Sequence, residues 1–288
     1  SSGSRSSSKA SVSAAQRRKA SSKDNGIFLC YAPLPKDMSD QTQPAAEAAQ
    51  TGIGPLPATG RDRMRGILRW VIYAVAILVA WPITMTILYA IVPPPFSNVM
   101  LLRSMSGNGL NKDWVSLEQI SPHLARAVIS SEDARFCEHW GVDWTEFQGV
   151  IEDAFDDDEG PIRGASTIPM QAAKNLFLWD GRFVIRKGLE LPLALWMDLV
   201  WSKRRMIEIY LNIVEWAPGV YGAEAAARHH FNKSAKDLSK REAALLAAVL
   251  PNPIKRQAGK PSKRVKSITN RILIRMNGMG PYLACLGP

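Results

Sequence analysis

The chain has 288 residues, of which 46 % are hydrophobic, enough for one sizeable core with additional segments. Its net charge is +10, but residues 1–69 carry a surplus of six cations and residues 93–288 a surplus of only four. This uneven distribution excludes a uniformly basic nucleic-acid-binding domain. The cysteines Cys30, Cys137 and Cys285 include no C-x-x-C pair, which excludes a zinc module and a disulfide-rich scaffold. Whether Cys137 and Cys285 form a bridge is left open.

The N-terminal part of the chain is poor in large apolar side chains. Residues 1–60 are rich in Ser, Ala, Gln, Pro and Lys. Such a segment cannot bury enough apolar surface to offset the entropy that it would lose on ordering. We therefore predict a disordered tail over residues 1–66.

A run of 23 uncharged residues extends from Trp70 to Val92. About 20 apolar residues span the hydrocarbon core of a bilayer, so this run predicts one transmembrane helix, which we place at residues 67–92. The alternative, a buried core helix, is disfavoured by the length of the run and by Pro82, which membrane helices tolerate better. A cleaved signal peptide would have a shorter apolar region and a small-residue cleavage site.

The charges that flank this run indicate its orientation. After the run, the first cation is Arg103. Before it lie four arginines, Arg61, Arg63, Arg65 and Arg69. Cationic flanks stay on the cytoplasmic side of a membrane, so we expect the tail in the cytoplasm and residues 93–288 outside it.

The remaining residues, 93–288, amount to one domain and are expected to be mainly helical. Runs that alternate with period two are scarce. The acidic segment 156–161 interrupts the helices and predicts a mobile loop, and Pro251 predicts a helix stop. Apolar residues recur at helical spacing in four stretches: Leu124, Val128 and Ile129; Leu189, Leu193 and Trp196; Met206, Ile209, Tyr210 and Ile213; Leu245, Leu246, Val249 and Leu250.

The first of four clusters that could carry chemistry spans residues 131–141. If the cluster is helical, Glu132 lies one turn from Phe136. A carboxylate followed by Phe136, His139 and Gly141 is suggestive of a site. The structural alternative is a charged helix face with His139 near its C-terminus and Gly141 as its stop, and the pattern alone favours this alternative.

The second cluster is a small-residue turn that runs into a helix capped by Ser166 or Thr167. The free N–H groups of such a helix N-terminus suit an anion. Gln171 and Lys174, three residues apart, share one face of this helix. A plain capped helix without a ligand is an equally good interpretation of the local pattern.

The third cluster, residues 182–190, places Arg182, Arg186 and Lys187 ahead of the lone carboxylate of Glu190. A phosphate-bearing substrate would use such cations as charge-assisted hydrogen-bond donors. The structural alternative is a basic face beside anionic lipid at a membrane surface.

The fourth cluster covers residues 203–212 and 219–226, and most of it reads as packing and capping. Each cluster is weak alone. Together, and in this order, the four resemble the glycosyltransferase modules that build peptidoglycan, which occur in class A penicillin-binding proteins and as free-standing enzymes. The resemblance covers about residues 95–280, including a late helix with Glu242.

Four motifs of that family carry the resemblance. The first, E-D-x-x-F-x-x-H-x-G, is matched by Glu132, Asp133, Phe136, His139 and Gly141. The second, G-G-S-T-I-T-Q-Q followed by K-N, is matched by Gly164, Ser166, Thr167, Ile168, Gln171, Lys174 and Asn175, but not by Ala165, Pro169 and Met170. The third, R-K-x-x-E, is matched by Arg186, Lys187 and Glu190. The fourth, K-x-x-I-L-E-x-Y-L-N, is matched by Lys203, Glu208, Tyr210, Leu211 and Asn212, with Met206 and Ile207 at its apolar positions.

The resemblance implies a fold. It is mainly α: a lysozyme-like helical glycosyltransferase domain over residues 93–288, with a small membrane-proximal jaw, preceded by one transmembrane helix. The segment 142–162, between the first two motifs, would be its mobile part. No K-T-G element of a transpeptidase occurs in the chain, so we predict a monofunctional enzyme.

The resemblance also implies an activity. The chain would polymerise lipid II, a lipid-linked disaccharide-peptide, into linear β-1,4 glycan strands by inverting transfer, with release of polyprenyl pyrophosphate. The partners would be lipid II, the growing lipid-linked strand and the bacterial inner membrane, with cell-wall synthesis or division proteins conceivable and no nucleic acid. No cofactor would be required, although a divalent cation on the pyrophosphate is conceivable.

The residues that match the motifs take expected roles by resemblance. Glu132 would be the general base, and Glu190 a second carboxylate for positioning or for the leaving-group side. Lys174 and Arg182 would contact the donor pyrophosphate, and Arg186 and Lys187 would join them or be structural. The donor side would be shaped by Ser166, Thr167 and Gln171. Asp133 would orient the neighbours of Glu132 or be structural.

Two other functions compete with this one. A carboxylate pair across a sugar also fits a membrane-anchored, lysozyme-like hydrolase. The cations argue against that hydrolase, because a neutral glycan has no pyrophosphate to hold. A non-catalytic cell-wall scaffold is the other alternative, and the complete motif set argues against it.

Overall fold

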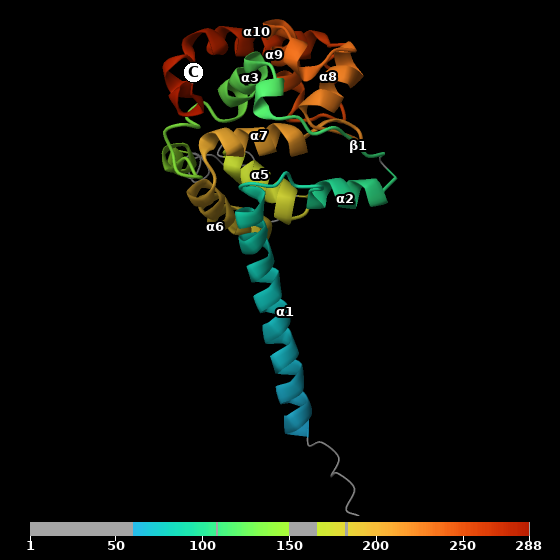
Figure 1. Ribbon diagram of the computed structural model, residues 1–288, viewed down its shortest axis with the longest axis vertical. Helices are drawn as coiled ribbons and strands as arrows, with labels where there is room; N and C mark the ends of the chain where they lie inside the picture. The colour runs from blue at the N-terminus through green and yellow to red at the C-terminus, as the bar shows by residue number, and fades with distance from the viewer. Residues whose placement is uncertain (1–59, 108, 150–165, 182–183, 288) are drawn as a thin grey trace, which may run out of the picture. The chain divides into compact units, whose positions relative to one another are not determined.

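The computed structural model divides the chain into two units and describes residues of the second, Ala58–Pro288. The described residues are 60–107, 109–149, 166–181 and 184–287. The predicted disordered tail up to residue 59, the acidic segment 156–161 and Arg182 lie outside them, as does most of the predicted mobile part. The second unit is mainly helical, as predicted (Figure 1).

The long helix α1 (Gly60–Tyr89) contains most of the predicted membrane span. Its stretch Arg63–Tyr89 has a mean hydropathy of 2.2. Only 6 % of the most apolar 18-residue segment within this stretch is buried. An apolar helix that leaves its side chains exposed suits a lipid environment, where every backbone group is satisfied within the helix. This helix is therefore long and apolar enough to cross a membrane.

The end of α1 is fixed to the rest of the unit by hydrogen bonds to its last carbonyl groups. Trp201 Nε1 donates to the carbonyl of Thr86 at 2.7 Å, and Arg205 Nε donates to that of Tyr89 at 2.9 Å. The last carbonyls of a helix lack partners within the helix, so these side chains satisfy them. These two hydrogen bonds join the C-terminal end of α1 to the segment that contains Trp201 and Arg205.

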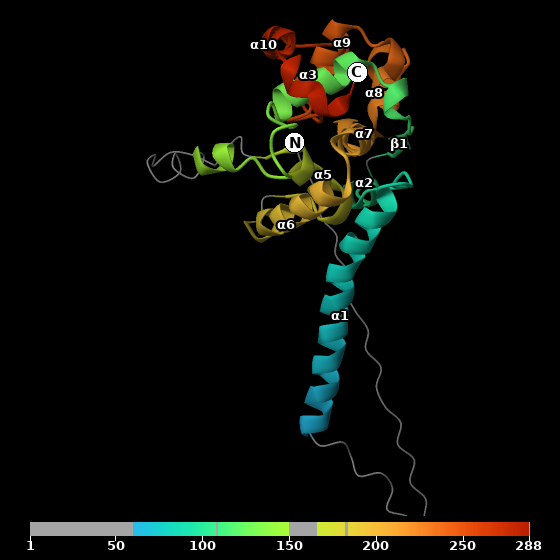
Figure 2. The same ribbon diagram turned by 60° about the vertical axis from the view of Figure 1, so that its left-hand side comes forward.

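Three helices form one layer of the unit: α3 (Pro122–Glu132), α9 (Lys240–Val249) and α10 (Lys263–Gly278). Both α3 and α9 contact α10 and each other (Figures 1 and 2). The contact is apolar, because α10 buries one stripe of side chains at helical spacing. These are Val265, Thr269, Ile272 and Met276.

A second layer consists of α5 (Ile168–Phe177), α6 (Val184–Val200) and α7 (Lys203–Ile213). Helix α5 packs against both α6 and α7, and α6 also contacts α1. Seven of the eight positions 206–213 of α7 are buried, so this helix is the centre of the core. They are Met206, Ile207, Ile209, Tyr210, Leu211, Asn212 and Ile213.

Short elements complete the unit. They are α2 (Asn98–Met105), β1 (Asn111–Lys112), η1 (Leu117–Gln119), β2 (Glu215–Ala217), β3 (Val220–Tyr221), α8 (Ala223–Phe231), η2 (Ala235–Asp237) and η3 (Pro281–Leu286). The strands form one sheet in the order β1-β3-β2, with β1 parallel and β2 antiparallel to β3. This sheet joins the segment after α2 to the connection between α7 and α8.

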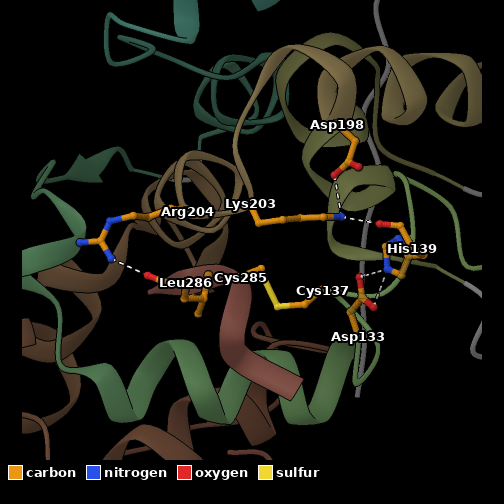
Figure 3. Close-up of a disulfide and its surroundings, with 8 residues drawn as sticks. All are labelled: Asp133, Cys137, His139, Asp198, Lys203, Arg204, Cys285 and Leu286. Carbon is orange, nitrogen blue, oxygen red and sulfur yellow. Dashed lines mark hydrogen bonds and ion pairs between the residues drawn. A yellow bond between two sulfur atoms is a disulfide. The ribbon is translucent and has the colours of Figure 1, made fainter. Parts of the chain in front are cut away.

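A disulfide joins Cys137, in the first motif, to Cys285 in η3 (Figure 3). The two Cα atoms are 5.5 Å apart, although 148 positions separate the residues in the chain. A cross-link over such a long loop restricts the unfolded chain strongly. The bridge therefore fastens the C-terminal end of the unit to the loop that follows α3.

Removal of this bridge is expected to lower the melting temperature. A disulfide that closes a long loop contributes about 2–4 kcal/mol, which corresponds to roughly 5–15 °C for a domain of this size. Cys137→Ser and Cys285→Ser should each show this loss in a thermal melt in detergent, as should the parent with a reductant. Cys30→Ser, which leaves the bridge intact, is the control. Equal melting temperatures for all variants would contradict the prediction.

Candidate active site

Glu132 is the last residue of α3 and lies half-buried between two cavities. One cavity has a volume of about 320 Å³ and is lined also by Asp133, Ser166 and Thr167. The other has about 270 Å³ and is lined also by Arg256 and by α10. The first and second motifs, more than 30 residues apart in sequence, thus meet at one carboxylate.

The surroundings of Glu132 favour a base. Burial raises the pKa of this carboxyl above its usual range, against the opposing effects of the Gln171 hydrogen bond and the Arg256 charge. A carboxylate with a raised pKa accepts a proton more readily at neutral pH. The structure therefore places the one carboxylate that was expected to act as base where it is suited to do so.

A relay of hydrogen bonds orients Glu132. Gln171 Nε2 donates to Glu132 Oε2 at 3.1 Å, and the Tyr210 hydroxyl donates to Gln171 Oε1 at 2.8 Å. Burial raises the pKa of Tyr210 well above its usual value, so the phenol keeps the proton that it donates. Because the hydroxyl occupies the amide oxygen, the amide nitrogen of Gln171 must face the carboxylate. Sequence reasoning did not assign Tyr210 any part in the site.

Tyr210→Phe is expected to lower the rate of the reaction that depends on Glu132 as a base about 2- to 10-fold. The change leaves Gln171 Oε1 without its donor, and one neutral hydrogen bond contributes about 0.5–1.5 kcal/mol. The measurement is the initial rate of product formation, with the melting temperature as a check on folding. Tyr282→Phe, which changes a partly exposed tyrosine of η3, is the matched control. An unchanged rate in a folded Tyr210→Phe protein would show that the relay is dispensable.

Asp133 and His139 fix the loop of the first motif rather than extending α3. Asp133 Oδ2 accepts a hydrogen bond from the backbone N–H of Ile168 at 2.9 Å, and His139 Nε2 lies 2.9 Å from Asp133 Oδ1 (Figure 3). Both side chains are buried. The condition that this cluster is helical is therefore not met: α3 ends at Glu132, and the carboxylate of Asp133 is bound to the start of α5.

Lys203 of the fourth motif supports the same loop. Its Nζ donates to the carbonyl of His139 at 2.6 Å and forms an ion pair with Asp198 at 2.7 Å (Figure 3). Gly141 ends the loop at φ 72°, and a Cβ there would lie 2.6 Å from the carbonyl oxygen of Ala194 in α6. Only glycine fits this position. The conformation of the loop beside Glu132 is thus set from three directions.

The second motif caps α5. Of the two expected caps, Thr167 is the N-cap: its hydroxyl accepts from Met170 N at 3.4 Å and donates to the carbonyl of Gly141 at 2.6 Å. Ser166 instead forms a hydrogen bond with Lys187 of α6 through its hydroxyl. The helix N-terminus that was expected to suit an anion therefore also carries a lysine from the third motif.

Glu190 is buried and bound by two cations of its own helix. Arg186 forms an ion pair with Glu190 Oε1, and Lys187 Nζ lies 2.9 Å from Oε2. Glu190 lines neither of the two cavities beside Glu132. Among the described residues, the buried Arg186 Nε has no hydrogen-bond partner. This geometry makes Glu190 a residue that positions the cations of its own helix.

Lys174 of α5 lies half-buried among these charges. Burial lowers its pKa, and the nearby Arg186 lowers it further, while Asp180 and Glu190 act in the opposite direction. A cation whose charged form is disfavoured gains most when an anion binds beside it. Lys174, Arg186 and Lys187 together form a cationic group on α5 and α6, which we call the α5–α6 cations.

Sequence reasoning missed three arginines near Glu132. Arg256, Arg271 and Arg275 line the 270 Å³ cavity with it. They match no motif of the resemblance. The signal that could have found Arg271 and Arg275 is the composition of α10, which contains five cations and no acidic residue.

Within the part of the chain that the structure describes, no group of three His, Cys, Asp or Glu side chains could hold a metal ion. The expectation that a divalent cation could lie on the pyrophosphate stays a prediction.

Comparison with known proteins agrees with the motifs. The family model described as "Transglycosylase" matches residues 98–277. The chain is 54 % identical over 192 residues to the biosynthetic peptidoglycan transglycosylase of Agrobacterium fabrum (strain C58), covering 67 % of this chain and 84 % of the relative. It is 52 % identical to that of Rhizobium meliloti (strain 1021), covering 67 % and 80 %. For Brucella suis biovar 1 (strain 1330), the identity is 48 %, covering 73 % and 93 %. The chain therefore belongs to the transglycosylase family.

Proposed function

We propose that this protein is a membrane-anchored peptidoglycan glycosyltransferase that polymerises lipid II into linear β-1,4 glycan strands. The observation that carries the proposal is the position of Glu132: a carboxylate with a raised pKa, held by Gln171, lies at the junction of two cavities. The α5–α6 cations on the neighbouring helices supply the charge that a departing pyrophosphate needs.

The reaction follows from these groups. The donor is the growing strand, joined through an α-linked pyrophosphate to its lipid, and the acceptor is the sugar hydroxyl of lipid II. Glu132 removes the hydroxyl proton while the oxygen attacks the anomeric carbon. The carbon–oxygen bond to pyrophosphate breaks, and its electron pair leaves with the phosphate. One displacement inverts the centre, so the new bond is β.

The α5–α6 cations have distinct parts in this step. Lys174 stabilises the charge that develops on the pyrophosphate, since charge stabilisation is strongest in a site that excludes water. Arg186, whose charge acts on Lys174, adds a second positive charge beside it. Glu190 keeps Arg186 and Lys187 in place. We propose that Arg182 joins them.

Two observations support an orientation with the catalytic unit outside the cytoplasm, and a third supports its contact with the membrane. Four arginines precede the apolar stretch of α1. The disulfide is a bond that persists in oxidising compartments such as the periplasm. In addition, α6 exposes large apolar side chains next to the end of α1, among them Ile185 and Leu199 at 68 % and 70 %. We propose the bacterial inner membrane as the location, with α6 facing the lipid as the membrane-proximal jaw.

The protein is proposed to need no cofactor of its own, and cell-wall synthesis or division proteins are its proposed partners. The proposal of these protein partners follows from the proposed activity, and that activity can be tested in the absence of the partners.

The test of the activity compares two substrates for the purified full chain in detergent. With fluorescent lipid II, we expect glycan strands on a gel that resolves chain length. With isolated cell-wall sacculi, we expect no release of short fragments. Fragments from sacculi without polymer from lipid II would instead identify a hydrolase, and neither product from a folded protein would favour a scaffold.

A further inference from the structure

A basic surface lies on the side of Glu132 away from the α5–α6 cations. Arg256, Arg271 and Arg275 line the same 270 Å³ cavity as Glu132. Helix α10 contacts α9 and α3, whereas the α5–α6 cations lie on the layer that contacts α1 (Figures 1 and 2). Arg275 also lines the 320 Å³ cavity, so cations reach the site beside Glu132 from α10 as well as from the layer that contacts α1.

The arginines of α10 form a stripe that faces this cavity. An α-helix turns by about 100° per residue, so Arg264, Ile268, Arg271 and Arg275 lie along one line, beside the buried stripe of the helix. Ile268, Arg271 and Arg275 from this line reach the cavity wall. The lysines of the same helix, Lys263 and Lys266, lie on the other side of the buried stripe.

The cations at this end have donors to spare. Arg271 and Arg275 are exposed, and none of the ion pairs between described residues involves either of them. Arg256 is half-buried, and its Nη1 donates to the carbonyl of Ala248 at 2.8 Å. That bond fixes the guanidinium while leaving further N–H groups free for a ligand. Guanidinium groups bind carboxylates in bidentate geometry.

The position of the surface indicates which anion reaches it. A lipid-linked pyrophosphate stays near the membrane and therefore near α6, on the α1 side. The sugar that reacts lies at Glu132. Apart from the pyrophosphate, the anionic groups of lipid II are the carboxylates of the peptide attached to its sugar. A peptide carries at least its terminal carboxylate at neutral pH.

We propose that Arg256, Arg271 and Arg275 form a subsite for the carboxylates of the peptide carried by the glycan. This inference rests on the proposed function, because it assumes lipid II as substrate. The cavity of about 270 Å³ is smaller than a typical whole-ligand pocket, so it admits one end of the peptide rather than all of it. The subsite would distinguish peptide-bearing substrate from substrate without free carboxylates.

The experiment measures kcat/KM of the full chain for two forms of lipid II, one with free peptide carboxylates and one with these carboxylates amidated. For the parent, we expect the free form to be favoured roughly tenfold, since each partly exposed ion pair contributes up to about 1 kcal/mol. For the double variant Arg271→Gln/Arg275→Gln, the ratio should fall to about one, mainly through KM. Lys263→Gln/Lys266→Gln removes the same charge from the other side of α10 and should keep the parental ratio.

The other outcomes distinguish failure of the proposed subsite from failure of the proposed function. An equal loss with both substrates, together with a changed pH profile of kcat, would overturn the proposal and show that the arginines act through Glu132. An unchanged ratio in the arginine variant would overturn it as well. If the folded parent polymerises neither form, it is the proposed function that fails. Activity on the amidated form shows that each variant is folded.

Discussion

Glu132→Gln is expected to reduce polymerisation of lipid II by at least 10²- to 10⁴-fold, the range that a general base contributes. The amide keeps the shape of the side chain and its contact with Gln171, but it cannot accept the hydroxyl proton. The measurement is the initial rate of strand formation from fluorescent lipid II. Glu138→Gln is the matched control, because Glu138 is an exposed carboxylate of the same loop.

The raised pKa of Glu132 gives this prediction two further consequences. The base must be ionised, so the activity of the parent should fall as the pH drops through a value above the usual carboxyl range. A carboxyl whose pKa is raised by folding contributes stability below its unfolded pKa and loses it as the pH rises through the folded pKa. At neutral pH the ionised group is therefore unfavourable, and Glu132→Gln should melt at the same temperature as the parent or higher. A markedly lower melting temperature would contradict this reasoning.

Lys174→Met is expected to lower kcat about 10²- to 10³-fold, the effect of removing one group that stabilises charge in the transition state. The loss should appear in kcat more than in KM, because the pyrophosphate gains charge as the bond breaks. Burial already disfavours the charged form of Lys174, so an apolar side chain of similar length should not destabilise the fold.

The control for Lys174→Met is Lys236→Met, which removes one cation from an exposed position in η2. It should leave the rate unchanged. If Lys174→Met polymerised lipid II as fast as this control, Lys174 would not contact the leaving group. A rise in KM without a change in kcat would mean that Lys174 binds the ground state of the substrate as strongly as it binds the transition state.

The parts of the fold that depend on local pattern were predictable from the sequence. The four stretches of apolar residues at helical spacing lie in α3, α6, α7 and α9, except that Leu250 is the C-cap of α9, directly before Pro251. A transmembrane helix was predicted at residues 67–92, and the apolar helix α1 extends from Gly60 to Tyr89. Hydropathy does not detect its first turns, because they are polar and continue the helix without contributing to the apolar run.

Contacts between distant segments could not be predicted in this way. Cys137 and Cys285 meet only because η3 packs beside the first motif. The first cluster was weighed as a continuous helix, yet Asp133 bonds to Ile168, 35 positions away, and ends α3. A local pattern cannot show which partner a carboxylate will find in the folded chain.

In the candidate site, too, local sequence pattern was predictable and contacts between distant segments were not. Motif matching selected Glu132, Gln171 and Lys174 as candidates, because their types and spacing match the motifs of the family. It could not show that Tyr210 orients Gln171, since that bond joins α7 to α5. The arginines of α10 were overlooked because they belong to no motif, although the absence of acidic residues from that helix was visible in the sequence.

The central claim, that Glu132 is the base of glycan polymerisation, is tested most directly on one gel. Parent and Glu132→Gln proteins, both shown by thermal melting to be folded, are given fluorescent lipid II in detergent under the same conditions. We predict a ladder of strands from the parent and only unreacted lipid II from the variant. An equal ladder from the variant would contradict the role of Glu132, and no ladder from the parent would contradict the function itself.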